Sequence, residues 1–185
     1  MLIAGIVLVV LVVLIVAWVI SIYNRLVRLR NLKSEGWSGI DVQLKRRHDL
    51  VGNLVNSVKG YMTHERGVLE DVTRMRSESQ KASGVAATVA AESGLSSALG
   101  RLFAVMENYP DLKSSANVLE LQNSLSHLEN ELQMARRYYN GTVRDLNTLI
   151  QTFPVNFVAR KFGFTEAEFF ELDNAEERIA PTVAF

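Results

Sequence analysis

The chain has 185 residues, and its 20 basic and 20 acidic residues give no net charge at neutral pH. This balance argues against nucleic acid or another polyanion as a partner. The absence of cysteine excludes disulfides, thiol nucleophiles and thiolate metal ligands.

The chain begins with an uncharged apolar run from Leu2 to Ile20. As a helix, this run would span about 28 Å, close to the hydrocarbon thickness of a bilayer. A signal peptide would have a basic segment before a shorter apolar core, with small residues at the cleavage site. Bulky residues occupy that place here, around Trp18. We therefore expect residues 1–24 to be a retained, single-pass transmembrane anchor in the lipid bilayer.

A basic juxtamembrane segment, residues 25–36, follows the span directly. Basic residues near a span stay on the cytoplasmic side of the membrane. The predicted orientation therefore has a short N-terminus outside and the remaining domain in the cytoplasm, at the inner or plasma membrane. The basic residues that set this orientation are Arg25, Arg28, Arg30 and Lys33.

Apolar residues then recur at alternating strides of three and four. One stripe runs from Trp37 to Met75, a second from Leu95 to Tyr109, and a third from Val118 to Phe153, where Pro154 ends it. Such stripes are typical of helices that pack lengthwise. They predict an all-α fold in which residues 37–153 form an elongated antiparallel helical bundle. The expected helices cover about 37–80, 88–108 and 112–153.

Local signals refine this arrangement. Ser38 and Asp41 resemble a capping box at the start of the first bundle helix, and Gly36 and Gly39 suggest a bend there. The sequence leaves open whether the membrane helix runs unbroken into the bundle. Residues 82–94 are mostly small, so we expect a mobile connection that can be partly helical.

Residues 154–185 form a C-terminal segment with a different character. Val155, Phe157, Val158, Phe162 and Phe164 predict an apolar patch, and a capping box from Thr165 to Glu168 predicts a short helix through Glu171. An acidic tail follows and ends at Phe185. Its terminal carboxylate suits capture by a partner's pocket, and a frayed tail is the alternative.

Two charged residues, Arg47 and Glu65, occupy positions on the first apolar stripe. A charge in a bundle core is costly unless paired, and a paired charge tends to fix helix register or partner choice. The alternative is a loosely buried stripe from which both side chains reach water. Both interpretations stay open. The expected partners are Glu129 and Glu131 for Arg47, and Arg136 and Arg137 for Glu65.

The sequence offers little for catalysis. His64 and Glu65 begin like the zinc-protease motif H-E-x-x-H, but Val68 stands where the second histidine is needed. Neither a glycine-framed serine nor a phosphate-binding glycine loop is present. We therefore predict no catalytic residue, no metal and no cofactor. Lys45 and Arg46, beside Asp41 and Asp49, suit either an acidic partner or a solvated face of ion pairs.

Several segments of the chain form a combined motif. They are Tyr23-Asn24-x-x-Val27, Trp37 to Val55, Val58 to Glu65, Glu107-x-Tyr109-Pro110, Ala135-Arg136-x-x-Tyr139-Asn140, Phe153-Pro154 and Gly163-Phe164. Taken together, these segments resemble the LemA family over nearly the whole chain. Gly52 departs from the pattern, because the family commonly has proline there.

The resemblance implies a bacterial single-span protein with a helical-bundle domain and no established catalytic residues. We predict a non-enzymatic, membrane-anchored scaffold or adaptor that assembles with itself, as a homo-oligomer, or with membrane partners. Association of relatives with HtpX-type membrane metalloproteases suggests an alternative, an adaptor or regulator of such a protease. A hydrolase with a site not visible in the sequence is a third hypothesis. Candidate interaction residues are Tyr23, Asn24, Trp37, Asp41, Lys45, Arg46, Asp49, Arg136, Tyr139, Asn140 and Phe185.

Overall fold

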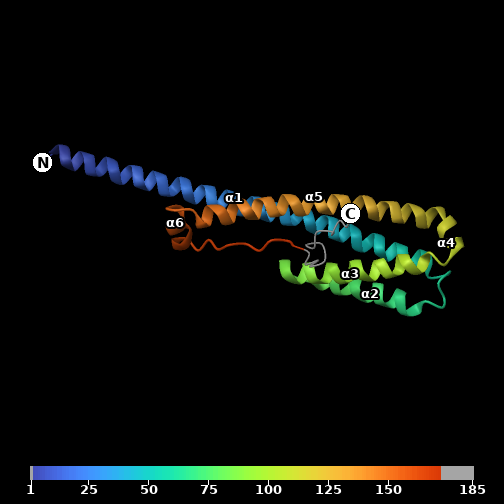
Figure 1. Cartoon of the computed structure of the whole chain (residues 1–185). Helices are drawn as coiled ribbons and strands as arrows, with labels where there is room; N and C mark the ends of the chain where they lie inside the picture. The colour runs from blue at the N-terminus through green and yellow to red at the C-terminus, as the bar shows by residue number, and fades with distance from the viewer. Residues whose placement is uncertain (1, 172–185) are drawn as a thin grey trace, which may run out of the picture. The chain divides into compact units, whose positions relative to one another are not determined.

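The computed structural model describes residues 2–171, and the regular structure in this range is helical, which confirms the all-α prediction (Figure 1). The chain divides into two compact units. One contains residues 2–43 and 131–169, and the other contains residues 44–130 with Phe170 and Glu171. The helices are α1 (Leu2–Val58), α2 (Arg66–Lys81), α3 (Val85–Met106), α4 (Pro110–Ser114), α5 (Ala116–Gln151) and α6 (Val155–Lys161).

Helix α1 is one continuous helix of 57 residues that begins in the apolar run. It is long and apolar enough to cross a membrane, and none of its most apolar stretch is buried. The expected helix start and bend near residue 37 are wrong. The Ser38 hydroxyl does not cap a helix but donates to the carbonyl of Ser34, 3.1 Å away and one turn earlier.

In the first unit, α1 and α5 lie side by side and antiparallel, and α6 packs where they meet (Figure 1). Apolar side chains from all three helices make the core, because each helix turns one apolar face inward. The buried members are Ile22, Leu26, Leu146, Leu149, Val158, Ala159 and Phe164.

After α6 and a turn at residues 162–163, residues 164–169 form a strap without regular structure that is tied to α5. The Tyr139 hydroxyl donates to the carbonyl of Glu168 at 3.0 Å. The Asn147 amide donates to the carbonyl of Ala167 at 2.9 Å and accepts from its N–H at 2.8 Å. The helix expected from Thr165 onward is therefore wrong, because side chains of α5 occupy the backbone groups it would use. The short helix of this segment is α6.

In the second unit, α1 ends at Val58 and the chain turns back before α2. The single helix expected over residues 37–80 is therefore two helices. Val58 and Met62 are both fully buried, so the turn itself belongs to the core. The core residues come from five helices and this turn, and include Val51, Leu54, Leu69, Val72, Leu95, Leu99, Leu102, Leu112 and Leu125.

Helices α2 and α3 pack against each other through a tight connection at residues 82–84. Gly84 there has a φ of 84°, a backbone conformation that favours glycine. Most of the expected 82–94 linker is thus helical, as its alanine content permits. Gly94 lets the helices approach closely, because a Cβ there would lie 3.0 Å from Sδ of Met75.

Gly36 provides a test of the contact between α1 and α5. A Cβ at Gly36 would lie 3.1 Å from the Cα of Tyr139, whereas one at Gly39 would meet nothing within 4 Å. We expect Gly36→Val to destabilise the protein by about 1–3 kcal/mol through overpacking. The matched control Gly39→Val should leave stability nearly unchanged. Thermal unfolding in mild detergent measures both, and equal midpoints would contradict the described contact.

Candidate functional site

The second unit contains a cluster of buried charged and polar side chains. Arg47 and His48 of α1 are 3% and 6% exposed, Ser79 of α2 is 5% exposed, and Glu92 of α3 is completely buried. A buried charge is costly unless partners replace its water. We call these four residues the ionic cluster.

Arg47 contacts two helices through its guanidinium. Its Nη1 donates to Oε2 of Glu92 at 2.5 Å, and its Nη2 donates to Oγ of Ser96 at 2.9 Å, both on α3. Its Nε lies 2.8 Å from Oε1 of Glu129 on α5. The Nε–H does not point at that oxygen, so this contact is an ion pair without a hydrogen bond. Arg47 therefore joins α1 to both α3 and α5.

The other oxygen of Glu92 faces a histidine and a serine. His48 Nε2 lies 2.8 Å from Oε1 of Glu92 and 2.9 Å from Oγ of Ser79. The Ser79 hydroxyl donates to the same carboxylate oxygen. Arg47 and Ser79 therefore hydrogen-bond the two carboxylate oxygens of Glu92, and His48 is a further donor when its Nε2 carries the proton.

These contacts determine the charge of Glu92. Burial alone would raise the pKa of Glu92, but hydrogen bonds from His48, Ser79 and Arg47, together with the positive charge of Arg47, lower it to about 2. Glu92 is therefore ionised at neutral pH.

A serine, a histidine and a glutamate in contact invite comparison with a catalytic triad. In a triad the acid orients Nδ1 of the histidine, while the serine faces Nε2. Here Ser79 and Glu92 both face Nε2, and the serine directs its proton to the carboxylate. This arrangement lacks triad geometry. It binds the helices to one another through charge-assisted hydrogen bonds.

Arg76 of α2 extends the polar contacts to the backbone of α1. Its Nε donates to the carbonyl of His48 at 2.5 Å. The guanidinium passes over Gly52, where a Cβ would lie 3.1 Å from its Cζ. The lack of a side chain at Gly52 thus makes room for this contact.

A groove of about 490 Å³ lies beside the ionic cluster, between α3 and α5. Leu99, Phe103 and Leu125 line it together with Arg47 and Glu129. It combines apolar walls with one ion pair, a lining typical of small ligand or peptide side-chain sites.

The two charges on the predicted stripe behave differently. Arg47 is buried, and its expected ion pair with Glu129 is present. Glu65 is half-buried at the N-cap position of α2, after the end of α1. The stripe position assigned to Glu65 assumed a helix through residues 59–65, and that helix is absent because the chain turns there. The role of Arg47 in helix register stays a prediction.

Among the candidate interaction residues, Trp37 and Tyr139 form a ring contact in the first unit with centroids 5.5 Å apart. Asp41 accepts a hydrogen bond from Trp37. Tyr23 contacts Phe162 and Phe164 through its ring. The remaining candidates are Asn24, Lys45, Arg46 and Asp49, all exposed on α1, Arg136 and Asn140, both half-buried on α5, and Phe185, which lies outside the described residues.

His64 is exposed in the turn before α2. Within residues 2–171, no group of three histidine, aspartate or glutamate side chains is arranged to hold a metal ion.

Sequence reasoning missed Glu92, Ser79 and Ser96. Glu92 lies in the segment predicted to be a mobile linker, where a charged residue requires no partner. A signal was nevertheless present, since Glu92 is the one charged residue between Val85 and Gly100. A lone carboxylate in an otherwise apolar and small-residue helix indicates a specific partner.

We expect Glu92→Gln to destabilise the protein by about 3–5 kcal/mol, because it leaves the Arg47 guanidinium buried without its main counter-charge. Glu78→Gln is the matched control: Glu78 pairs with Arg74 on α2, and both side chains are more than half exposed. The stability lost in this control variant should be much smaller. Urea unfolding monitored by circular dichroism measures the unfolding free energy of both variants. Similar losses of free energy would contradict the prediction that the buried charge of Glu92 matters more than the exposed charge of Glu78.

The lowered pKa of Glu92 also predicts a pH dependence. A carboxylate with a pKa of about 2 when folded, against 4.5 as its ordinary value, contributes stability above pH 4.5. That contribution, roughly 3 kcal/mol, is lost as pH falls from about 5 to about 2. The difference in unfolding free energy between the native protein and Glu92→Gln should therefore shrink over this range. A constant difference would contradict the prediction.

Comparison with known proteins gives the family. The LemA family profile matches residues 36–185. Protein LemA of Metamycoplasma hominis is 31% identical over 157 residues, which cover 83% of this chain and 70% of the relative. Magnetosome protein MamQ 2 of Paramagnetospirillum magneticum is 27% identical over 175 residues, covering 80% of this chain. Magnetosome protein MamQ of Magnetospirillum gryphiswaldense is 25% identical over 174 residues, also 80% of this chain.

This chain spans 64% of the length of these MamQ relatives and 70% of the length of the LemA relative. The profile match covers most of the chain and includes the ionic cluster, the α2–α3 pair and α5. The chain belongs to the LemA family.

Proposed function

We propose that this protein is a non-enzymatic, membrane-anchored scaffold or adaptor that assembles through its helical bundle with itself or with membrane partners. The observation that carries the proposal is the continuity of α1 from Leu2 to Val58. One helix supplies both the apolar segment and core residues of each packed unit, such as Leu26 and Leu54.

The exposed surface supports assembly. Met134 and Tyr138 lie one turn apart on α5 and are 58% and 49% exposed. Val42 of α1 is 53% exposed and Leu119 of α5 is 52% exposed. Apolar side chains at one-turn spacing on a helix are what a neighbouring helix packs against. The buried charged side chains of Arg47 and Glu92, in contrast, are engaged with each other in the ionic cluster.

The proposed orientation places the bundle in the cytoplasm. Arg25, Arg28 and Arg30 are exposed on α1 just after the apolar segment, as expected of residues that hold a span's end on that side. Protease accessibility in inverted membrane vesicles tests this orientation, and a protected bundle would contradict it.

Single cysteines can test self-assembly, because the native chain has none. In a symmetric dimer, a residue near the two-fold axis faces its own copy. We expect Met134→Cys or Tyr138→Cys to form disulfide-linked dimers in native membranes under mild oxidation. Gln133→Cys, exposed on the same helix, is the control and should stay monomeric.

The second measurement is the particle mass in mild detergent together with crosslinking and co-purification from native membranes. Oligomers or a reproducible membrane partner are expected. A monomer that neither forms disulfides at these positions nor retains a partner would overturn the proposal.

A further inference from the structure

The end of the first unit that carries α6 has three exposed phenylalanines. Phe153, Phe157 and Phe162 are 75%, 62% and 51% exposed, and the rings of Phe153 and Phe157 are 5.9 Å apart. Single exposed apolar residues are ordinary, but a grouped set indicates a surface that meets a partner or a membrane.

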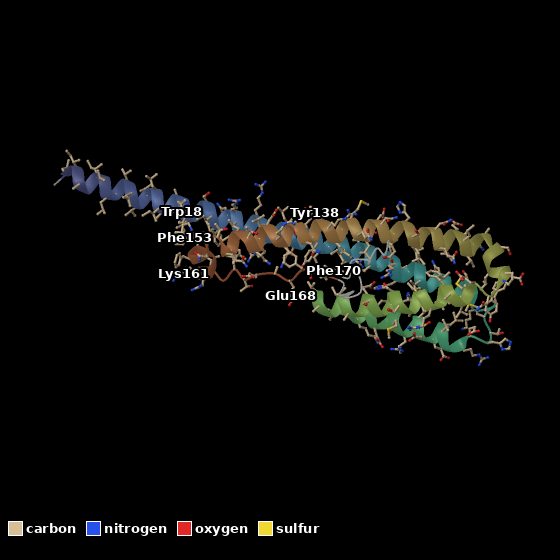
Figure 2. All side chains as sticks on the ribbon, viewed as in Figure 1. Trp18, Tyr138, Phe153, Lys161, Glu168 and Phe170 are labelled. Atoms are coloured by element: carbon tan, nitrogen blue, oxygen red, sulfur yellow. The ribbon has the colours of Figure 1, made fainter. Side chains whose placement is uncertain are left out.

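The group lies where the apolar part of α1 ends. The rings of Phe162 and Tyr23 are 5.0 Å apart, and Val19, inside the apolar run, packs against the core that contains Leu149. Because α5 runs antiparallel to α1, its last residue, Gln151, lies about 3 Å beyond Leu149 in the direction of the span, and Phe153 follows in the turn. In the view of Figure 2, Phe153 lies at about the same level along α1 as Trp18.

The chemistry of this segment suits a lipid headgroup region. Residues 150–164 contain no acidic residue, and Arg160 and Lys161 are exposed. Val158 and Ala159 are buried in the unit's core, whereas Phe157 is exposed. Aromatic rings with neighbouring basic side chains are typical of elements that lie at a membrane interface.

We propose that the turn between α5 and α6, together with α6, is a second membrane contact. Phe153 and Phe157 enter the interfacial region of the bilayer that α1 crosses, and Arg160 and Lys161 meet the phosphate groups. The occupant is the phospholipid bilayer, because the patch is continuous with the end of the span. The inference depends on α1 as an anchor and not on the scaffold role.

Such a contact would hold α1 in one orientation. A single helix can rotate about its axis and tilt in the bilayer. A second attachment beside α1 fixes its tilt, because leaning α1 away from that side would lift the phenylalanines out of the membrane.

The test uses the full chain in vesicles of phosphatidylcholine and phosphatidylglycerol. Phe157→Cys carries a polarity-sensitive dye. We expect its emission to shift to the blue, with quenching by lipids that bear a shallow nitroxide and little quenching by aqueous iodide. Gln133→Cys is the control. Gln133 is exposed on α5, about 30 Å along the chain direction from the phenylalanine end of that helix, so its dye should be quenched by iodide.

A third position, Val10→Cys in the middle of the apolar run, is measured with lipids that bear a deep nitroxide, and it distinguishes four outcomes. Lipid quenching at residues 10 and 157 supports the second contact. Lipid quenching at residue 10 alone overturns it and leaves the anchor intact. A blue shift at residue 157 without lipid quenching means that protein covers the patch, and this also overturns it. Without lipid quenching at residue 10, the anchor and the second contact both fail.

A further variant checks that the dye does not insert by itself. Phe153→Asp is added to the labelled Phe157→Cys protein. Phe153 is exposed, so the fold should be kept, and an unchanged unfolding midpoint verifies this. The blue shift should fall towards the value at residue 133, because a charged residue resists the interface. An unchanged shift would show that the native phenylalanine does not contribute and would overturn the proposal.

Discussion

The second unit depends on keeping the buried carboxylate of Glu92 ionised. Its partners come from two other helices, Arg47 and His48 from α1 and Ser79 from α2. A slip of α2 by one residue would turn Ser79 by about 100° away from the carboxylate. We infer that the charge selects one register of α1, α2 and α3, which an apolar core alone would define less sharply.

The first unit is held in a different way. Its core is apolar, aromatic rings fasten α6 to α1, and side chains of α5 bond the backbone of the strap. Arg30 lies over the ring of Phe164, 5.2 Å from its centroid, and adds a cation–π contact. Both units share α1, so the same helix is positioned by a charge in one unit and by rings in the other.

Much of the fold could be predicted, because the stripes record which faces are buried. The stripe ending at Phe153 indicated α5 to within a few residues, and Tyr109-Pro110 follows the end of α3 at Met106 by three residues. The stripe from Trp37 onward wrongly predicted a single helix, because its apolar residues keep their spacing across the turn at residues 59–65. The residues after the turn reach the same core from a new helix. Arg47 could be found because it interrupts a stripe. Glu92 could not, since its partners meet only after α2 folds back onto α1.

The strap is attached through its main chain, because Asn147 and Tyr139 bond the peptide groups of Ala167 and Glu168 and not their side chains. In evolutionary terms, residue 168, whose side chain is exposed, is free to change without detaching the strap, whereas Ala167 also packs against the core of the first unit. Positions 139 and 147 do not have that freedom. Relatives could therefore present different surfaces along this edge while keeping the same attachment.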